Sequence, residues 1–210
     1  MAIATRTTIL RFPFAEGIEL RLRPGVDIAE RAGFEALCED NPDMRIQRSG
    51  RGELTIEMPT KGFTGACNSL LAILLGVWAL ANGQGLTFDS STGFDLPEGS
   101  TLSPDAAWVR KERLEVLTSE QKKSFLPITP DFIAELRSDS DRLSPLQAKM
   151  VDWQSNGVRL GLLLDPANRK VHVYRLGNEP QILDDPTTID CSPELPGFLL
   201  DVKALFDLTL

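Results

Sequence analysis

The segment that most constrains the fold is residues 130–153, PDFIAELRSDSDRLSPLQAKMVDW, which has the pattern of a strand, a polar loop and a helix. With the two-residue period of a strand, Asp131, Ile133 and Glu135 share one face, whereas the other face is entirely apolar. Carboxylates are seldom buried unless they are paired or bind a cation. Two carboxylates on one face of an apolar strand therefore indicate either ion pairing or a functional site.

A helix is predicted to follow over residues 145–155, with Ser144 as its N-cap and Pro145 as its first residue. Its apolar side chains recur at helical spacing and form one stripe: Leu146, Met150 and Trp153. Lys149 borders this stripe, because residues three and four apart are neighbours on a helix surface. A lysine directed toward the region of the two strand carboxylates suggests a site.

Each of these residues also has an ordinary structural explanation. Glu135 could form a buried ion pair with Arg137 or Lys149. Asp131 follows Pro130, so it could start the strand or accept a loop hydrogen bond. Lys149 could extend along the apolar stripe and keep its ammonium group in water. The spacing alone leaves the functional and the structural interpretation of Lys149 open.

The length of 210 residues and the 42% hydrophobic content predict one domain with a sizeable core. We expect residues 1–26 to form an N-terminal arm or edge strand and residues 27–210 to form the domain. A helix is predicted over residues 27–39, with Asp27 and Glu30 as a capping box. The apolar pattern predicts a second helix over residues 66–81, buried between layers.

Two hairpins are predicted from alternating strands that flank short turns. Residues 45–58 contain the strands RIQR and ELTIEM around a glycine-bearing turn, with Met58 among the inward-facing residues. Residues 158–164 and 170–175 form the second pair. Thr118 and Gln121 are a possible reciprocal cap of a short helix.

The net charge of −8 indicates that the whole chain repels polyanions at long range. This disfavours an obligate nucleic-acid binder, although it leaves room for an enzyme with a locally basic or metal-loaded cleft. One stretch is more basic than the rest and is the best candidate for contact with a phosphate backbone. Its cations, which could also be a solvated surface, are Arg110, Lys111, Arg113, Lys122 and Lys123.

Cysteine and histidine are too few and too scattered for a zinc site. The three cysteines, Cys38, Cys67 and Cys191, have no metal-like spacing, and His172 is the single histidine, in what is predicted to be an exposed hairpin. Free thiols are typical of cytoplasmic proteins. The most apolar run, residues 70–81, is too short to cross a bilayer, so no membrane association is expected.

Several motifs occur in a fixed order along the chain. They are Ser103–Val109 (SPDAAWV), Pro130–Leu136 (PDFIAEL), Ser140–Leu143 (SDRL), Lys149-Met150, Asn156-Gly157, Leu164–Pro166 (LDP), Val173–Arg175 (VYR) and Leu195–Phe198 (LPGF). Together they resemble the Uma-two family of restriction-endonuclease-like proteins, in the PD-(D/E)XK nuclease superfamily, over residues 27–206. The resemblance implies a restriction-endonuclease-like α/β core, in which a mixed central sheet is flanked by helices.

The resemblance also implies a chemistry, namely metal-dependent hydrolysis of DNA phosphodiester bonds. Asp105 on one strand and Glu135 on the next would hold Mg²⁺ or Mn²⁺, which prefer carboxylate oxygens. Lys149 would orient the attacking water or stabilise the anionic transition state. The backbone carbonyl of Leu136 could complete the metal shell, and Glu53 is a weaker candidate.

This chain departs from the family pattern at three positions where relatives commonly carry glutamate: Gln47, Leu70 and Ala148. The departures favour an alternative function, in which a catalytically inactive nuclease fold serves as a binding or assembly module. If the protein is a nuclease, we expect DNA as its substrate and a homodimer as its assembly, because cutting both strands takes two sites.

Overall fold

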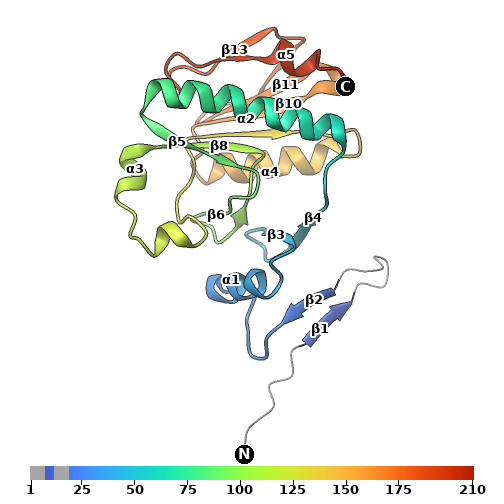
Figure 1. Cartoon of the computed structure of the whole chain (residues 1–210), viewed down its shortest axis with the longest axis vertical. Coiled ribbons are helices and arrows are strands. Elements are labelled where there is room, and N and C mark those ends of the chain that lie inside the picture. Colours follow the sequence, from blue (N-terminus) through green and yellow to red (C-terminus); the bar gives the residue numbers. More distant parts are fainter. Residues whose placement is uncertain (1–7, 12–18) are drawn as a thin grey trace, which may run out of the picture.

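The computed structural model describes residues 8–11 and 19–210, and a six-stranded mixed sheet lies at its centre (Figure 1). The strand order is β12-β11-β10-β9-β8-β5. Strands β9 and β10 pair in parallel, and the other neighbours in this sheet pair antiparallel. The bounds are β5 Gly85–Asp89, β8 Ala106–Arg110, β9 Phe132–Leu136, β10 Leu160–Asp165, β11 Lys170–Arg175 and β12 Gln181–Asp184.

Helices cover both faces of this sheet, which confirms the predicted architecture. On one face α2 (Gly62–Asn82) packs its buried Leu71 and Leu75 with Trp108 of β8. On the other face α4 (Leu143–Ser155), the crossover between β9 and β10, packs Trp153 with Ile133 of β9. Successive residues of a strand point to opposite faces, so β8 and β9 contribute to both cores.

Smaller sheets and helices, separate from the central sheet, complete the fold. Strands β13 (Thr188–Asp190) and β14 (Leu199–Asp201) and helix α5 (Val202–Phe206) lie beside α2 (Figure 1). A four-stranded sheet has the order β4 (Leu54–Glu57), β3 (Arg45–Arg48), β7 (Thr101–Leu102) and β6 (Phe94–Asp95). The remaining elements are β1 Thr8–Arg11, β2 Glu19–Leu22, α1 Arg31–Asp40, α3 Lys111–Glu115, η1 Gln121–Lys123 and η2 Pro166–Asn168.

Both predicted hairpins are confirmed, since β3 pairs antiparallel with β4, and β10 with β11. The reciprocal cap is confirmed as well: the Thr118 N–H donates to Gln121 Oε1 (2.9 Å), and the Gln121 N–H donates to Thr118 Oγ1 (3.2 Å). The predicted arm over residues 1–26 lies partly outside the described residues. Its described strands, β1 and β2, pair antiparallel in a sheet of their own.

Two predicted helix caps are wrong. Helix α1 begins at Arg31, and the Asp27 carboxylate instead accepts a hydrogen bond from the Ala29 N–H within a turn (2.9 Å). Helix α4 begins at Leu143, before the predicted Ser144 cap, because proline is tolerated anywhere in a first turn that needs no intrahelical donor.

The predicted burial of residues 66–81 between two layers is also wrong. Helix α2 begins four residues earlier, at Gly62, and packs on the sheet with one face, while Ile73, Val77 and Leu80 are exposed on the other. Its 21 residues are long and apolar enough to cross a membrane by length and composition, yet its inner face forms part of the protein core. Met58 is exposed too, because β4 ends at Glu57.

His172 is buried in β11 and not exposed as predicted. Burial lowers the pKa of its imidazole, because removal from water disfavours the charged form. The three cysteines are free thiols.

Candidate active site

The predicted residues Asp105, Glu135 and Lys149 lie at one edge of the central sheet, the edge that is formed by the ends of its strands. Strands β8 and β9 are antiparallel, with Ala106 opposite Ala134, so the start of β8 and the end of β9 meet at this edge. Asp105 immediately precedes β8, and its Oδ2 accepts a 2.6 Å hydrogen bond from the Leu136 N–H. The Asp105 side chain therefore continues the hydrogen bonding between β8 and β9 beyond the paired residues.

Glu135 is buried, with 3% of the residue exposed, and helix α4 supplies the partners of its carboxylate. The Lys149 ammonium lies 2.8 Å from Glu135 Oε1 and 3.1 Å from Oε2. The Trp153 indole N–H donates to Oε1 at 3.0 Å. Lys149 and Trp153 are four residues apart, so they share one helix face and reach the same carboxylate. Lys149 also donates to the Ser103 carbonyl oxygen (2.8 Å), which ties it to the segment before Asp105.

Burial dominates the electrostatics of the site. It raises the pKa of Glu135 to about 7, against the Lys149 ammonium, and the nearby Asp105 charge adds to the rise. Burial also raises the pKa of Asp105, against its hydrogen bond from Leu136 and the charge of Lys149. Burial acts to lower the pKa of Lys149, but the surrounding carboxylates, Glu135 first, raise it overall. The site therefore holds its lysine charged and its two carboxyl groups easy to protonate.

Two polar residues at the site were not predicted from the sequence. The Asn68 side chain of α2 donates from Nδ2 to Asp105 Oδ1 at 3.2 Å. Glu57 of β4 lies close enough to raise the pKa of Lys149, and it pairs with Arg45 at 2.6 Å. Gln47 connects this pair to the site, because it donates to Glu57 and accepts from the Ser103 N–H.

The structure also shows where the other predicted positions lie. Glu53 is exposed in the turn before β4, so the acidic residue that this hairpin brings near Lys149 is Glu57. Ala148 is exposed on α4, and Leu70 packs against the core between α2 and the sheet. The Leu136 peptide reaches Asp105 through its N–H. Metal binding by its carbonyl stays a prediction.

The basic stretch lies at the other end of the same strands. Arg110 ends β8, and its backbone N–H donates to Asp131, which precedes β9 (2.9 Å). The Asp131 carboxylate also pairs with Arg113 at 3.0 Å. Lys111 lies beside Glu115, at 3.9 Å, and Lys122 and Lys123 form part of η1. The structure therefore does not bring the predicted phosphate-contact residues together with Asp105, Glu135 and Lys149.

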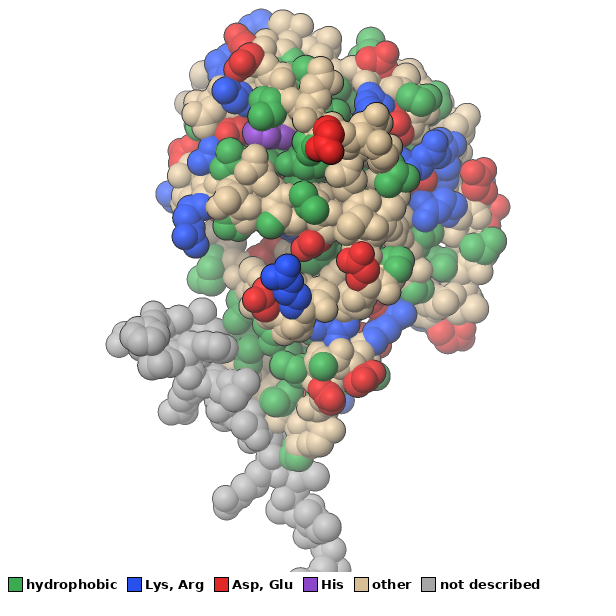
Figure 2. All heavy atoms as spheres, turned by 180° about the vertical axis from the view of Figure 1, so that it is seen from behind, with side chains coloured by type: hydrophobic (Ala, Val, Ile, Leu, Met, Phe, Trp, Pro, Cys, Tyr) green, Lys and Arg blue, Asp and Glu red, His purple; other side chains and the backbone are tan. Residues whose placement is uncertain are grey.

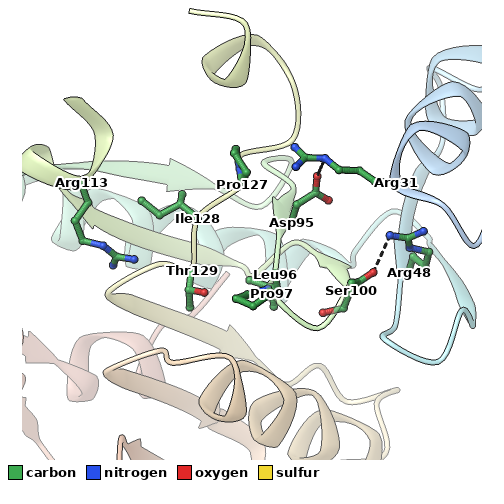
Figure 3. A pocket seen from close by; sticks show the side chains of 11 residues that line it. Arg31, Arg48, Asp95, Leu96, Pro97, Ser100, Arg113, Pro127, Ile128 and Thr129 are labelled. Carbon is green, nitrogen blue, oxygen red and sulfur yellow. Dashed lines mark hydrogen bonds and ion pairs between the residues drawn. The ribbon is translucent and has the colours of Figure 1, made fainter. Parts of the chain in front are cut away.

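A cavity of about 450 Å³ lies apart from these three residues (Figure 3). Arg48 of β3 lines it, whereas the neighbouring Gln47 points to the opposite face of that strand, toward Ser103. Arg31 pairs with Asp95 across it at 2.5 Å, and Arg113 faces it from α3. Its lining combines three arginines with apolar and small residues, and it includes none of Asp105, Glu135 and Lys149.

The donors at the sheet edge suit a hard divalent cation in part. Among residues 8–11 and 19–210, no group of three or more His, Cys, Asp or Glu side chains is close enough to hold a metal ion. Asp105 and Glu135 supply carboxylate oxygens from adjacent strands, and the Oδ1 atom of Asn68 is buried without a hydrogen-bond partner in the same region. An unpartnered amide oxygen on a side chain that contacts Asp105 fits a cation site, since amide and carboxylate oxygens are what Mg²⁺ and Mn²⁺ bind.

Replacing Trp153 with Phe should cost about 1–3 kcal/mol more stability than replacing Trp108 with Phe. Both rings are fully buried in the core on either side of the sheet. The Trp153 indole N–H binds Glu135, whereas that of Trp108 has no partner among the described residues. Both changes remove similar ring volume, so their difference in urea unfolding at pH 8 isolates the hydrogen bond. Equal losses would show that Trp153 acts only by packing.

Residues 31–203 match the family model Uma2, described as "Putative restriction endonuclease". Among solved structures, the chain is similar to "a putative nuclease belonging to DUF820" from Anabaena variabilis ATCC 29413. The two chains share 17% sequence identity over 77% of this chain and 89% of that one, with a TM-score of 0.66. No curated protein matches the chain in sequence.

Proposed function

From the premise that the chain belongs to the Uma2 family, "Putative restriction endonuclease", we propose that it is a divalent-metal-dependent endonuclease that hydrolyses DNA phosphodiester bonds. The observation that carries this proposal is the convergence of Asp105, Glu135 and Lys149 at one sheet edge. There the lysine is held 2.8 Å from one carboxylate, and the Leu136 peptide links the other carboxylate to the same strand.

Asp105 and Glu135 would hold Mg²⁺ or Mn²⁺. When bound, such a cation offsets charge on the phosphoryl oxygens and lowers the pKa of an attacking water. The residues of this chain have their own tasks. Trp153 fixes the orientation of Glu135, and the Ser103 carbonyl fixes that of Lys149. Lys149, kept charged by the carboxylates around it, supplies a positive group where negative charge develops on the phosphoryl oxygens.

The substrate must reach this site against the overall charge of the protein. On the face drawn in Figure 2, basic and acidic side chains are interspersed and form no broad basic surface. DNA binding would be weak, as expected for a chain of net charge −8 that repels polyanions at long range. Two copies would place two sites on one duplex, so we propose a homodimer, acting in the cytoplasm.

Nicking of supercoiled plasmid tests the nuclease function directly. Wild-type protein with Mn²⁺ or Mg²⁺ should convert supercoiled plasmid to nicked and linear forms, and chelation of the cation should stop the reaction. Glu135→Gln, prepared in parallel, controls for a contaminating nuclease because it keeps the shape of the side chain. Wild type that cleaves no double-stranded, single-stranded or branched DNA with either cation would refute the proposal.

A second candidate function, a binding or assembly module without catalysis, is favoured by two observations. Both oxygens of Glu135 are already engaged by Lys149 and Trp153, and family positions that commonly carry glutamate are occupied here by Gln47 and Leu70. An intact fold with no cation response and no cleavage is what this candidate predicts.

A further inference from the structure

We propose that Asn68 is a third side-chain ligand of the cation, binding through its amide oxygen Oδ1 beside Asp105. The inference rests on the proposed metal-dependent function and deepens it. It assigns to helix α2 a ligand at a position other than Leu70, where family resemblance leads one to look.

The placement of α2 is the first support. Asn68 lies one residue after Cys67 and three before Leu71, both buried against the sheet, so it is close to the inner face of the helix near its N-terminal end. This end lies at the edge of the sheet where β8 begins, because the Asn68 side chain reaches Asp105. Leu70 instead packs against the apolar core between α2 and the sheet.

The second support is the unpartnered oxygen of Asn68. Its Nδ2 donates to Asp105 Oδ1, while its Oδ1 is buried and has no hydrogen-bond partner among the described residues. A buried acceptor without a partner is costly, and such atoms are usually satisfied by water, an ion or a ligand. A half-turn of the amide would bring this oxygen beside Asp105, where a cation could bind it.

The third support is the spacing between the two side chains. Asn68 Nδ2 lies 3.2 Å from Asp105 Oδ1. Rotating the amide by half a turn exchanges its nitrogen and oxygen, and this terminal torsion has a broad, roughly twofold preference. The amide oxygen would then take the place of the nitrogen. Two oxygens on adjacent corners of an Mg²⁺ octahedron, each about 2.1 Å from the ion, lie about 3 Å apart, so the spacing suits two ligands of one ion.

The amide oxygen of Asn68 is chemically suited to bind a divalent cation. An Asn carbonyl oxygen is a normal ligand of hard cations, and the number of charged ligands tunes the affinity of a site. With Asp105 and Glu135 as its charged members, the site would bind a cation more weakly than one with a third carboxylate. It would also suffer less mutual repulsion when no cation is bound.

Three variants of α2 test the assignment by calorimetric titration with Mn²⁺ and by the Mn²⁺-dependent melting temperature, without reference to cleavage. Asn68→Ala should weaken Mn²⁺ binding by on the order of tenfold or more. Asn68→Asp should tighten it by about tenfold, because it adds a charged ligand. Without metal, Asn68→Asp should melt earlier than wild type, since it places a second carboxylate beside Asp105. Leu70→Asp, two residues away, should not tighten binding.

The outcomes separate the two proposals. If wild type binds Mn²⁺ and both Asn68 variants bind it with unchanged affinity, Asn68 is not a ligand and the proposed function stands. If Leu70→Asp tightens binding as much as Asn68→Asp, the assignment to Asn68 also fails. If neither wild type nor Asn68→Asp responds to Mn²⁺, both proposals fall. If Asn68→Ala does not fold, Asn68→Asp still tests the assignment, because tighter Mn²⁺ binding supports it and unchanged or weaker binding contradicts it.

Discussion

Replacing Lys149 with Met should lower the rate of plasmid cleavage by about a hundredfold or more. The change removes the positive side chain that lies 2.8 Å from Glu135, at the place where negative charge would develop in the transition state. Loss of one such preorganised group typically has an effect of about this size. The methionine keeps the apolar stem, so packing along α4 should persist. Single-turnover cleavage at saturating Mn²⁺ measures the effect on the chemical step.

The Lys149→Met replacement should also lower the melting temperature of the metal-free protein, and the decrease should be larger at pH 8 than at pH 6. Without Lys149, the buried Glu135 must either stay charged with no counterion or take up a proton, which is easier at lower pH. Lys111→Met is a matched control, because Lys111 is an exposed lysine at the opposite end of β8. Cleavage by Lys149→Met within threefold of wild type would contradict a catalytic role for the lysine.

Asp105→Asn should abolish the thermal stabilisation that Mn²⁺ gives to wild type. At a concentration one hundred times the dissociation constant, a bound cation stabilises by about 2.7 kcal/mol. The asparagine removes one of the two negative charges that would hold it. Differential scanning calorimetry with and without Mn²⁺ measures the change. Glu115→Gln, an exposed charge removal in α3, serves as the control. Equal Mn²⁺ affinity in Asp105→Asn and wild type would refute the assignment of Asp105.

The stabilisation by Mn²⁺ should also grow as pH rises from about 5 to 8. In the folded protein Glu135 has a pKa of about 7, whereas an unfolded glutamate titrates near 4.3. Because the folded pKa is raised, this group's contribution to metal-free stability is complete below about pH 4 and is lost as pH rises through 7. A cation competes with that proton, so its benefit is small at pH 5.5 and levels off above 7. A stabilisation independent of pH would show that Glu135 does not take part.

The central sheet and the helices that cover it could be predicted from the sequence, because the patterns that indicate them lie within short segments. Alternation in β9 and the stripe of α4 each follow from a single periodicity. The sequence also predicted that Glu135 and Lys149 approach each other, since a strand, a short loop and a helix leave few arrangements. Helix ends were predicted poorly, as at Ser144, because several cap geometries satisfy the same few donors.

The partners that sequence reasoning missed come from distant segments. Asn68 and Glu57 reach the site from α2 and β4, and no local periodicity links them to residues 105–149. Trp153 was assigned to the apolar stripe, which is correct for its ring, but a buried indole N–H also requires an acceptor. That requirement was the one available signal, and it points to a carboxylate on the facing strand. The exposed face of α2 was missed because an uncharged helix predicts burial on all sides.

The bond from the Leu136 N–H to Asp105 Oδ2 determines which substitutions can be interpreted. This carboxylate oxygen takes the part of a main-chain acceptor at the end of the β8–β9 pairing. Alanine at position 105 would therefore leave a strand end frayed, and lost activity in that variant would say nothing about chemistry. Asparagine can keep an acceptor oxygen for the Leu136 N–H while it removes the charge, and its amide nitrogen then takes the place of the oxygen that accepts from Asn68. Alanine scanning of this chain would therefore not separate the structural role of Asp105, which joins β8 to β9, from a catalytic role.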